Sequence, residues 1–256
     1  MGRIVTFLLL LIIFGATAQA RAADKITIAA AADLKFALDE IVSDFRKSQP
    51  GTDIEVVYGS SGKLHTQIRQ GAPFDMFFSA DISYPRDLSE KGEAASPVKP
   101  YGTGRIVLWS NSMDAGRMTL ASLLDPKISK IAIANPKHAP YGRRAEEALR
   151  AEGLWDRLQP RIVTGENISQ TARFIQSKNA QIGIIALSLA LSPELSGKGG
   201  YYLIPEKLHK PLEQGFIITK RGGNNPLARR FSDHMESPAV RSIMKKYGFH
   251  LPGEAK

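Results

Sequence analysis

The chain has 256 residues, of which 43% are hydrophobic, and a formal net charge of +9. This length and hydrophobic content allow a large core, in one large domain or two lobes, and argue against a disordered chain. The sequence contains no cysteine, which excludes disulfides, thiolate metal sites and lipid attachment through a cysteine. Basic residues lie among acidic ones, as in residues 143–147, so we expect most of them on solvated helix faces rather than in a nucleic-acid-binding block.

The N-terminus has the layout of a secretory signal. Arg3 precedes an apolar run at residues 4–13, and the small residues Ala20 and Ala22 form a cleavage frame. An uncleaved membrane anchor is the competing interpretation, but a spanning helix needs about 20 consecutive apolar residues and this run is shorter. We therefore predict a signal peptide at residues 1–22 and an exported protein, which argues against a nucleic-acid partner.

Predicted strands and helices alternate at the start of the mature chain. Apolar residues repeat every two positions in a strand and every three or four in a helix. The pattern predicts strands at residues 26–30, 54–58 and 74–78, and helices at 34–45 and 64–70. Asp33 stands where the N-cap of the first helix is expected. This alternation is typical of an α/β fold with largely parallel sheets.

A proline-containing connection at residues 93–100 precedes a second set of strands and helices. Strands are predicted at residues 105–109, 131–134, 182–185 and 215–219, and helices at 143–152 and 169–177, with a last helix that contains Leu227, Phe231 and Met235. Two α/β lobes joined by two extended crossings fit this order. We assign residues 23–104 plus 216–256 to lobe I and residues 105–215 to lobe II.

Four predicted helix starts carry small or polar residues. Residues 59–63 place two serines between two glycines after a predicted strand, where ligands of open α/β sheets bind. The first turn of a helix has backbone N–H groups without internal partners and a partial positive charge, so it can hold an anion. The helix starts are Ala32-Asp33, Ser60-Ser61-Gly62, Pro140-Tyr141-Gly142 and Asn167-Ile168. If the two lobes face one another, these helix starts can converge on one buried anion.

The loop with two serines also has to be compared with enzyme motifs. It lacks the spacing of a Walker phosphate loop, and Leu64 stands where that loop requires a magnesium-binding hydroxyl. It does not match the G-x-S-x-G nucleophile motif. The histidines show no spacing typical of a catalytic base or a metal pair; they are His65, His138, His209, His234 and His250. An exported serine hydrolase with Ser60 or Ser61 as its nucleophile remains a remote alternative.

Several segments resemble one known family in the same order along the chain. They are residues 25–34 (KITIAAAADL), 59–62 (GSSG), 67–75 (QIRQGAPFD), 78–81 (FSAD), 135–142 (NPKHAPYG), 183–184 (GI) and 246–249 (KYGF). Together they resemble the periplasmic molybdate-binding proteins (the ModA family) of ABC importers, over essentially the whole mature chain.

The resemblance implies an α/β type II periplasmic binding protein, with two lobes joined by two crossing strands and a cleft that closes over molybdate or tungstate. It implies a periplasmic monomer that is not an enzyme, needs no cofactor and passes its ligand to a membrane permease with a cytoplasmic ATPase. Another tetrahedral oxyanion, such as sulfate or phosphate, is the alternative ligand. Phosphate is partly protonated at neutral pH and would favour an acceptor carboxylate such as Asp33.

The resemblance also implies an oxyanion site built from neutral donors. Ser61 matches a hydroxyl donor of the family, and Tyr141 and Ile168 match backbone N–H donors. Lys63 and Arg143 lie beside these donors, and we expect both at the rim, where they steer anions. The predicted ligand-binding residues are Ala32, Asp33, Ser60, Ser61, Tyr141 and Ile168.

Two positions depart from the family pattern. Asp33 stands where many members have a serine, and an ionised carboxylate would repel a dianion. We therefore expect its side chain to cap its own helix, while its backbone N–H, with that of Ala32, faces the ligand. Ala186 stands where some members supply a tyrosine hydroxyl, which Tyr141 is expected to replace from across the cleft.

Overall fold

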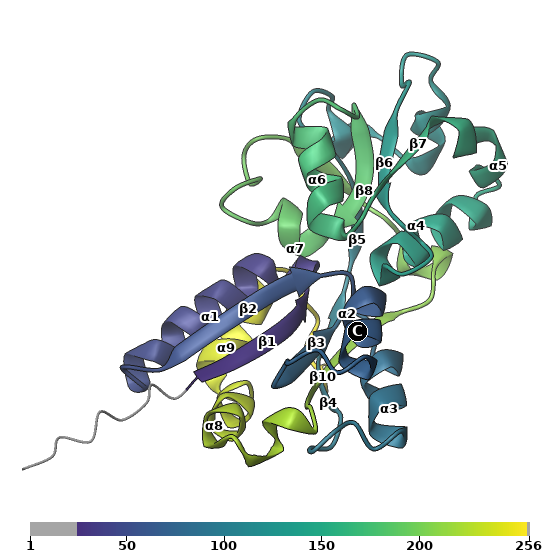
Figure 1. Ribbon diagram of the computed structural model, residues 1–256. Helices are drawn as coiled ribbons and strands as arrows, with labels where there is room; N and C mark the ends of the chain where they lie inside the picture. The colour runs from purple at the N-terminus through teal and green to yellow at the C-terminus, as the bar shows by residue number, and fades with distance from the viewer. Residues whose placement is uncertain (1–24, 255–256) are drawn as a thin grey trace, which may run out of the picture.

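The structure, a computed structural model, describes residues 25–254. The signal peptide predicted at residues 1–22 lies outside the described residues. Within residues 25–254 the strands form two five-stranded sheets, one in each lobe (Figure 1). The first sheet has the order β2 (Asp53–Gly59), β1 (Lys25–Ala31), β3 (Met76–Ser79), β10 (Leu212–Ile218) and β4 (Lys99–Gly104). The second has the order β7 (Ile162–Gly165), β6 (Ile131–Ala134), β8 (Ile182–Ala186), β5 (Ile106–Ser110) and β9 (Gly200–Leu203).

Both sheets combine parallel and antiparallel strands. In the first, β1 is parallel to β2 and β3, whereas β10 is antiparallel to β3 and β4. In the second, β6 is parallel to β7 and β8, whereas β5 is antiparallel to β8 and β9. The sheets are therefore mixed rather than largely parallel, because the strands that flank the crossings run against their neighbours. The prediction of two α/β lobes is confirmed.

The chain passes between the two sheets twice. Arg105 alone separates β4 from β5 in the first crossing, and the second crossing, from β9 to β10, contains the 3-10 helix Glu206–Leu208. Arg105 Nε and Glu206 Oε1 are 2.9 Å apart, and this ion pair ties the two crossings together. The division into lobes I and II at particular residues stays a prediction; its second boundary, at 215/216, falls within β10.

Helices cover both faces of the first sheet. Ile26 and Ile28 of β1 belong to a buried cluster with α1, α8 and α9, whereas Ala29 belongs to a cluster with α2 and α3. Successive side chains of a strand point to opposite faces, so the two clusters lie on opposite sides of the sheet. The helices are α1 (Lys35–Ser48), α2 (Ser61–Arg69), α3 (Ser83–Glu90), α8 (Pro226–His234) and α9 (Pro238–Lys246).

The second lobe has its own core around β6 and β8, whose residues are all buried. Its helices are α4 (Pro140–Ala151), α5 (Trp155–Leu158), α6 (Ile168–Gln176) and α7 (Leu187–Ala190). Further 3-10 helices lie at Ala32–Leu34 (η1), Ala115–Arg117, Leu120–Leu124, Gln159–Arg161 and Arg221–Asn224. Phe36 and Tyr58 pack against the cores of both lobes, which brings the lobes together. Among the described residues, no helix is both long and apolar enough to cross a membrane.

Candidate functional site

Four helix starts converge on one small cavity between the lobes. η1 and α2 approach from the first lobe, and α4 and α6 approach from the second. The cavity has a volume of about 10 Å³. The cavity is lined by Ala31, Ala32, Asp33, Gly59, Ser60, Ser61, Ala80, Ala139, Pro140, Tyr141 and Ile168. The structure thus brings together all six residues selected from the sequence, while their contact with a ligand stays a prediction.

Ser61 is the first residue of α2 and is 1% exposed. Its Oγ accepts a hydrogen bond from the backbone N–H of Ala80, with the two atoms 3.0 Å apart. Because this bond uses a lone pair of the oxygen, the hydroxyl proton remains available for a ligand. The backbone N–H of Ser61 lies in the first turn, so it has no acceptor within the helix.

The residues on either side of Ser61 contact His138 in the second lobe. Ser60 Oγ lies 2.9 Å from His138 Nδ1, and the Gly62 N–H donates to the His138 carbonyl oxygen at 3.0 Å. A Cβ atom at Gly62 would lie 2.6 Å from that oxygen and 2.8 Å from the Tyr84 hydroxyl, so only glycine permits this approach. Burial lowers the pKa of His138, which favours its neutral ring. These contacts join the start of α2 to the second lobe beside the cavity.

The helix starts of the second lobe also present backbone donors. Pro140 is the first residue of α4 and has no N–H, so the first-turn donors of this helix are Tyr141 and Gly142. At α6, the Asn167 side chain caps a later N–H of the first turn at 3.0 Å. That cap leaves the N–H of Ile168 without an acceptor within the helix.

Two serines of the second lobe hold the backbone of η1. Ser169 Oγ donates to the Ala32 carbonyl oxygen, and Ser188 Oγ donates to the Asp33 carbonyl oxygen, each at 2.8 Å. The N–H that follows a carbonyl in a trans peptide points in the opposite direction. The Asp33 N–H therefore points away from the Ser169 hydroxyl that holds η1.

The Asp33 side chain does not cap its helix, so that expectation was wrong. Asp33 lies inside η1, which runs directly into α1, and the residue before α1 already has helical backbone angles (φ −78°, ψ −9°). The carboxyl is 1% exposed, and its Oδ2 accepts hydrogen bonds from the Tyr141 hydroxyl and Gln214 Nε2, both at 3.0 Å. Burial raises its pKa from 3.8 to about 6, although these two hydrogen bonds and an interaction with the backbone N–H of Asp33 itself lower it. Its Oδ1 is buried and has no hydrogen-bond partner in the described part of the chain.

A polar network that no sequence pattern indicated lies behind Asp33. Gln214 Nε2 also lies 3.0 Å from the Tyr141 hydroxyl, and Gln214 Oε1 accepts a hydrogen bond from Tyr101 at 2.7 Å. Burial raises the pKa of both tyrosines well above the usual value, so their hydroxyls keep their protons. Gln214 lies 181 positions from Asp33, and no local pattern marks it. The tyrosine hydroxyl expected to replace the one missing at Ala186 is bonded within this network.

Lys63 and Arg143 form ion pairs between the lobes. Lys63 pairs with Glu166, and Arg143 Nη2 lies 3.0 Å from Asp81 Oδ2. Among the described residues, the lining of the cavity includes neither cation. Residues 25–254 also contain no group of three or more histidine, cysteine, aspartate or glutamate side chains that could hold a metal ion. The cavity wall therefore offers neutral donors together with the single carboxyl of Asp33.

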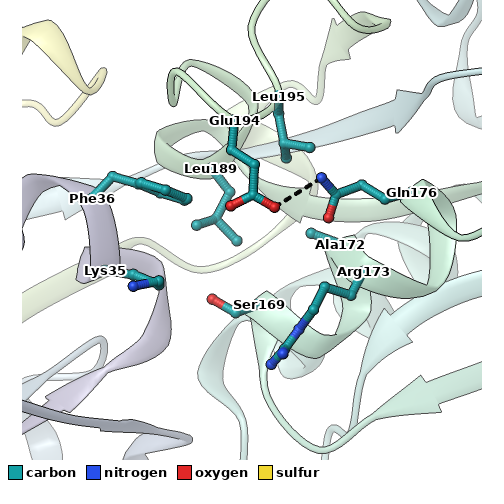
Figure 2. A pocket seen from close by; sticks show the side chains of 9 residues that line it. All are labelled: Lys35, Phe36, Ser169, Ala172, Arg173, Gln176, Leu189, Glu194 and Leu195. Carbon is teal, nitrogen blue, oxygen red and sulfur yellow. Dashed lines mark hydrogen bonds between the residues drawn. The ribbon is translucent and has the colours of Figure 1, made fainter.

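A larger hollow of about 200 Å³ lies between α1, α6 and the segment after α7 (Figure 2). Lys35 and Phe36 line it from the first lobe, and Leu189 is part of its apolar wall. Glu194 and Gln176, which also line it, are hydrogen-bonded at 3.0 Å. Because its lining mixes apolar side chains with charges of both signs, it lacks the converging neutral donors of the small cavity.

Comparison with known proteins places the chain in a family. The model of the bacterial extracellular solute-binding proteins matches residues 26–250. The chain belongs to this family. The molybdate-binding protein ModA of Rhodobacter capsulatus is 35% identical to this solute-binding protein over 230 residues, which are 89% of each chain. ModA of Azotobacter vinelandii is 32% identical over 239 residues, 93% of this chain and 94% of the relative.

Solved structures show the same two-lobed fold. The periplasmic molybdate-binding protein of Azotobacter vinelandii matches this solute-binding protein with a TM-score of 0.82 and 31% identity, over 89% of this chain and 99% of that chain. The sulfate-binding protein SubI of Mycobacterium tuberculosis has a TM-score of 0.74 at 14% identity, over 90% and 87% of the two chains, which is a likeness of fold alone. The resemblance to the ModA family stated from the sequence is confirmed.

Proposed function

We propose that this solute-binding protein captures molybdate or tungstate in the periplasm and delivers it to an ABC importer. The observation that carries the proposal is the convergence of four helix starts, two from each lobe, on one small cavity. Helix starts supply oriented N–H groups and partial positive charge, which suit an oxyanion. The relatives named for molybdate binding, which match most of the chain, support the choice of ion.

The proposed donors are neutral. We assign the oxyanion to the Ser61 hydroxyl and to backbone N–H groups at Ala32 and Asp33, at Tyr141 and at Ile168. Ser60 is a weaker donor, because its hydroxyl is shared with His138. Fixed dipoles can hold a dianion without an opposed lysine or arginine, whose strong attraction would discriminate less by size and hinder release.

The cavity is small. Its volume is about 10 Å³, whereas sites for drug-sized organic molecules have volumes of about 300–1,000 Å³. A tetrahedral oxyanion needs four sets of donors in a small volume, and the four helix starts offer them. Sugars, amino acids and peptides would require a much larger opening of this cavity than a compact ion.

Titration calorimetry of ligand-free protein with molybdate, tungstate, sulfate and phosphate tests the proposal. We expect tight binding of molybdate and tungstate and much weaker binding of sulfate and phosphate. Sulfate and phosphate remain the alternative ligands within the same site. Micromolar or weaker molybdate binding, together with tight phosphate binding, would overturn our choice of ion.

One observation bears on the serine hydrolase alternative. Ser60 Oγ lies 2.9 Å from His138 Nδ1, and His138 Nε2 lies 3.7 Å from Glu166 Oε1. The second distance is too long for a hydrogen bond, and Glu166 also pairs with Lys63. We therefore propose that the protein is not an enzyme; turnover of a chromogenic ester that disappears in Ser60→Ala would contradict this.

The remaining parts of the proposal follow from the family. The partner is an inner-membrane permease with a cytoplasmic ATPase, and the protein acts as a monomer without a resident cofactor. Light scattering coupled to size-exclusion chromatography should give the mass of one chain with and without molybdate. A stable dimer would contradict the monomer.

A further inference from the structure

The Asp33 carboxyl occupies an unusual position for an anion-binding site. It lines the cavity, is 1% exposed, and accepts side-chain hydrogen bonds from Tyr141 and Gln214 on Oδ2. Oδ1 is equally buried but has no hydrogen-bond partner among residues 25–254. A buried polar atom without a partner is costly, and natural sites that contain one commonly use it for a ligand or a proton.

The groups packed around Asp33 do not include a cation that would hold its charge. α4 contributes Tyr141, β4 contributes Tyr101 and β10 contributes Gln214, all of them neutral. α6 and α7 contribute only serine hydroxyls, which bond to the backbone of η1.

The charged groups near the cavity are already paired with one another. Lys35, two positions after Asp33, is 3.1 Å from Asp39. At the rim, the Lys63–Glu166 and Arg143–Asp81 ion pairs balance their own charges. An ionised Asp33 would therefore meet a bound dianion with no neutralising partner, and like charges repel strongly in a buried site.

We propose that Asp33 binds the oxyanion in its protonated form, with the proton carried on the otherwise unpartnered Oδ1 and donated to a ligand oxygen. Asp33 is then a specificity-determining residue, because it supplies a donor where many family members have a serine. The inference rests on the proposed function. Its consequence is that the protein takes up one proton from solvent with each dianion that it binds.

Because molybdate binding requires a proton on Asp33, the affinity for molybdate depends on pH. Burial sets the pKa of the Asp33 carboxyl at about 6, so the group is largely ionised in the ligand-free protein at neutral pH. A bound dianion raises that pKa further. Above about pH 6 each rise of one pH unit should weaken molybdate binding about tenfold, and below that pH the affinity should level off.

Calorimetry in buffers of different ionisation enthalpy measures the proton directly. At about pH 7.5, where molybdate itself is fully ionised, the observed enthalpy plotted against buffer enthalpy should give an uptake of about one proton per ion. In Asp33→Asn the uptake should vanish and the dissociation constant should lose its pH dependence. Asp33→Ser serves as a second neutral variant if the asparagine variant fails to fold.

His138→Gln is the matched control, because His138 is a titratable group that contacts Ser60 beside the cavity, and burial lowers its pKa. Whatever its affinity, this variant should still take up one proton. The inference is overturned if wild-type protein binds molybdate without proton uptake, or if uptake survives in Asp33→Asn and disappears in His138→Gln. Tight hydrogen phosphate binding without molybdate binding would also overturn it, since Asp33 would then accept the proton of the ligand. Absence of any oxyanion binding at all pH values would instead refute the proposed function.

Discussion

At the scale of single residues, Ser61 and Asp33 each leave one polar atom free for a ligand, but in different ways. Ser61 keeps its hydroxyl proton available because its oxygen already accepts from Ala80. Asp33 keeps one oxygen unpartnered because Tyr141 and Gln214 both donate to the other. Both residues were selected from the sequence as neighbours of helix starts, but the partners that define their chemistry come from distant strands and helices.

Replacing Ser61 with alanine should weaken molybdate binding by about 1–3 kcal/mol, because it removes a donor to a charged ligand. The same truncation at Ser177, which lies after the end of α6 away from the cavity, should leave binding unchanged. Titration calorimetry measures both dissociation constants. An unchanged constant in Ser61→Ala would remove this residue from the site.

Asp33 should also make the stability of the ligand-free protein depend on pH. Because folding raises its pKa from 3.8 to about 6, the folded state binds the proton more tightly than the unfolded state. The stability from this proton is fully present below about pH 3.8 and is lost as the pH rises through about 6. Asp33→Asn should therefore be more stable than wild type by up to about 3 kcal/mol at about pH 7.5 and similar to it near about pH 4. Denaturant unfolding measures the free energy of unfolding of both proteins at the two pH values. A difference between Asp33→Asn and wild type that is the same at both would contradict the raised pKa of Asp33.

At the scale of elements, helix starts were predictable because their signals are local. Asp33, the serines and glycine of residues 60–62, Pro140 with Gly142, and Asn167 marked the four helix starts, and the structure brings them to one cavity. The capping role of Asp33 was predicted wrongly, because a 3-10 turn before α1 has the same sequence signature as a helix cap. The pairing of β10 with β3 and β4, which brings Gln214 to the site, depends on contacts across the whole chain and leaves no local pattern.

Replacing Gly62 tests how closely the start of α2 must approach the second lobe for tight binding. In Gly62→Ala the new Cβ would lie 2.6 Å from the His138 carbonyl oxygen, so the lobes could not close fully. We expect molybdate affinity to fall more than about tenfold, while the thermal stability of ligand-free protein changes little, because alanine favours a helix. Gly116→Ala is the control, since its Cβ would make only ordinary contacts, the nearest at 3.5 Å. Full affinity in Gly62→Ala would show that closure tolerates a wider gap.

At the scale of the whole molecule, ion pairs at the rim link the lobes. The alternation of strands and helices predicted two α/β lobes, but no sequence pattern predicted which charges meet across the gap. Arg143 and Lys63 pair with Asp81 and Glu166, and their expected role in steering anions stays a prediction. Their contribution to closure should therefore decrease as salt screens them.

Arg143→Ala should weaken molybdate binding by up to about 1 kcal/mol at low ionic strength, the upper end of the range for exposed ion pairs. The difference from wild type should shrink at high salt. Arg150→Ala is the matched control on the same helix, because Arg150 pairs with Glu146 within α4. Calorimetry at two salt concentrations measures the affinity of each variant. An equal loss of affinity in Arg143→Ala and Arg150→Ala would mean that the loss comes from a change in α4 rather than from the ion pair between the lobes.

The Arg105–Glu206 ion pair has a consequence for how an ion leaves. This ion pair joins the only two chain crossings between the sheets in residues 25–254. We therefore expect the lobes to rotate about one short hinge rather than slide past each other. Each lobe carries two of the four helix starts. A single rotation would remove half of the donors from a bound ion at once, so we expect the opened protein to hold the ion through the donors of one lobe alone before it is released.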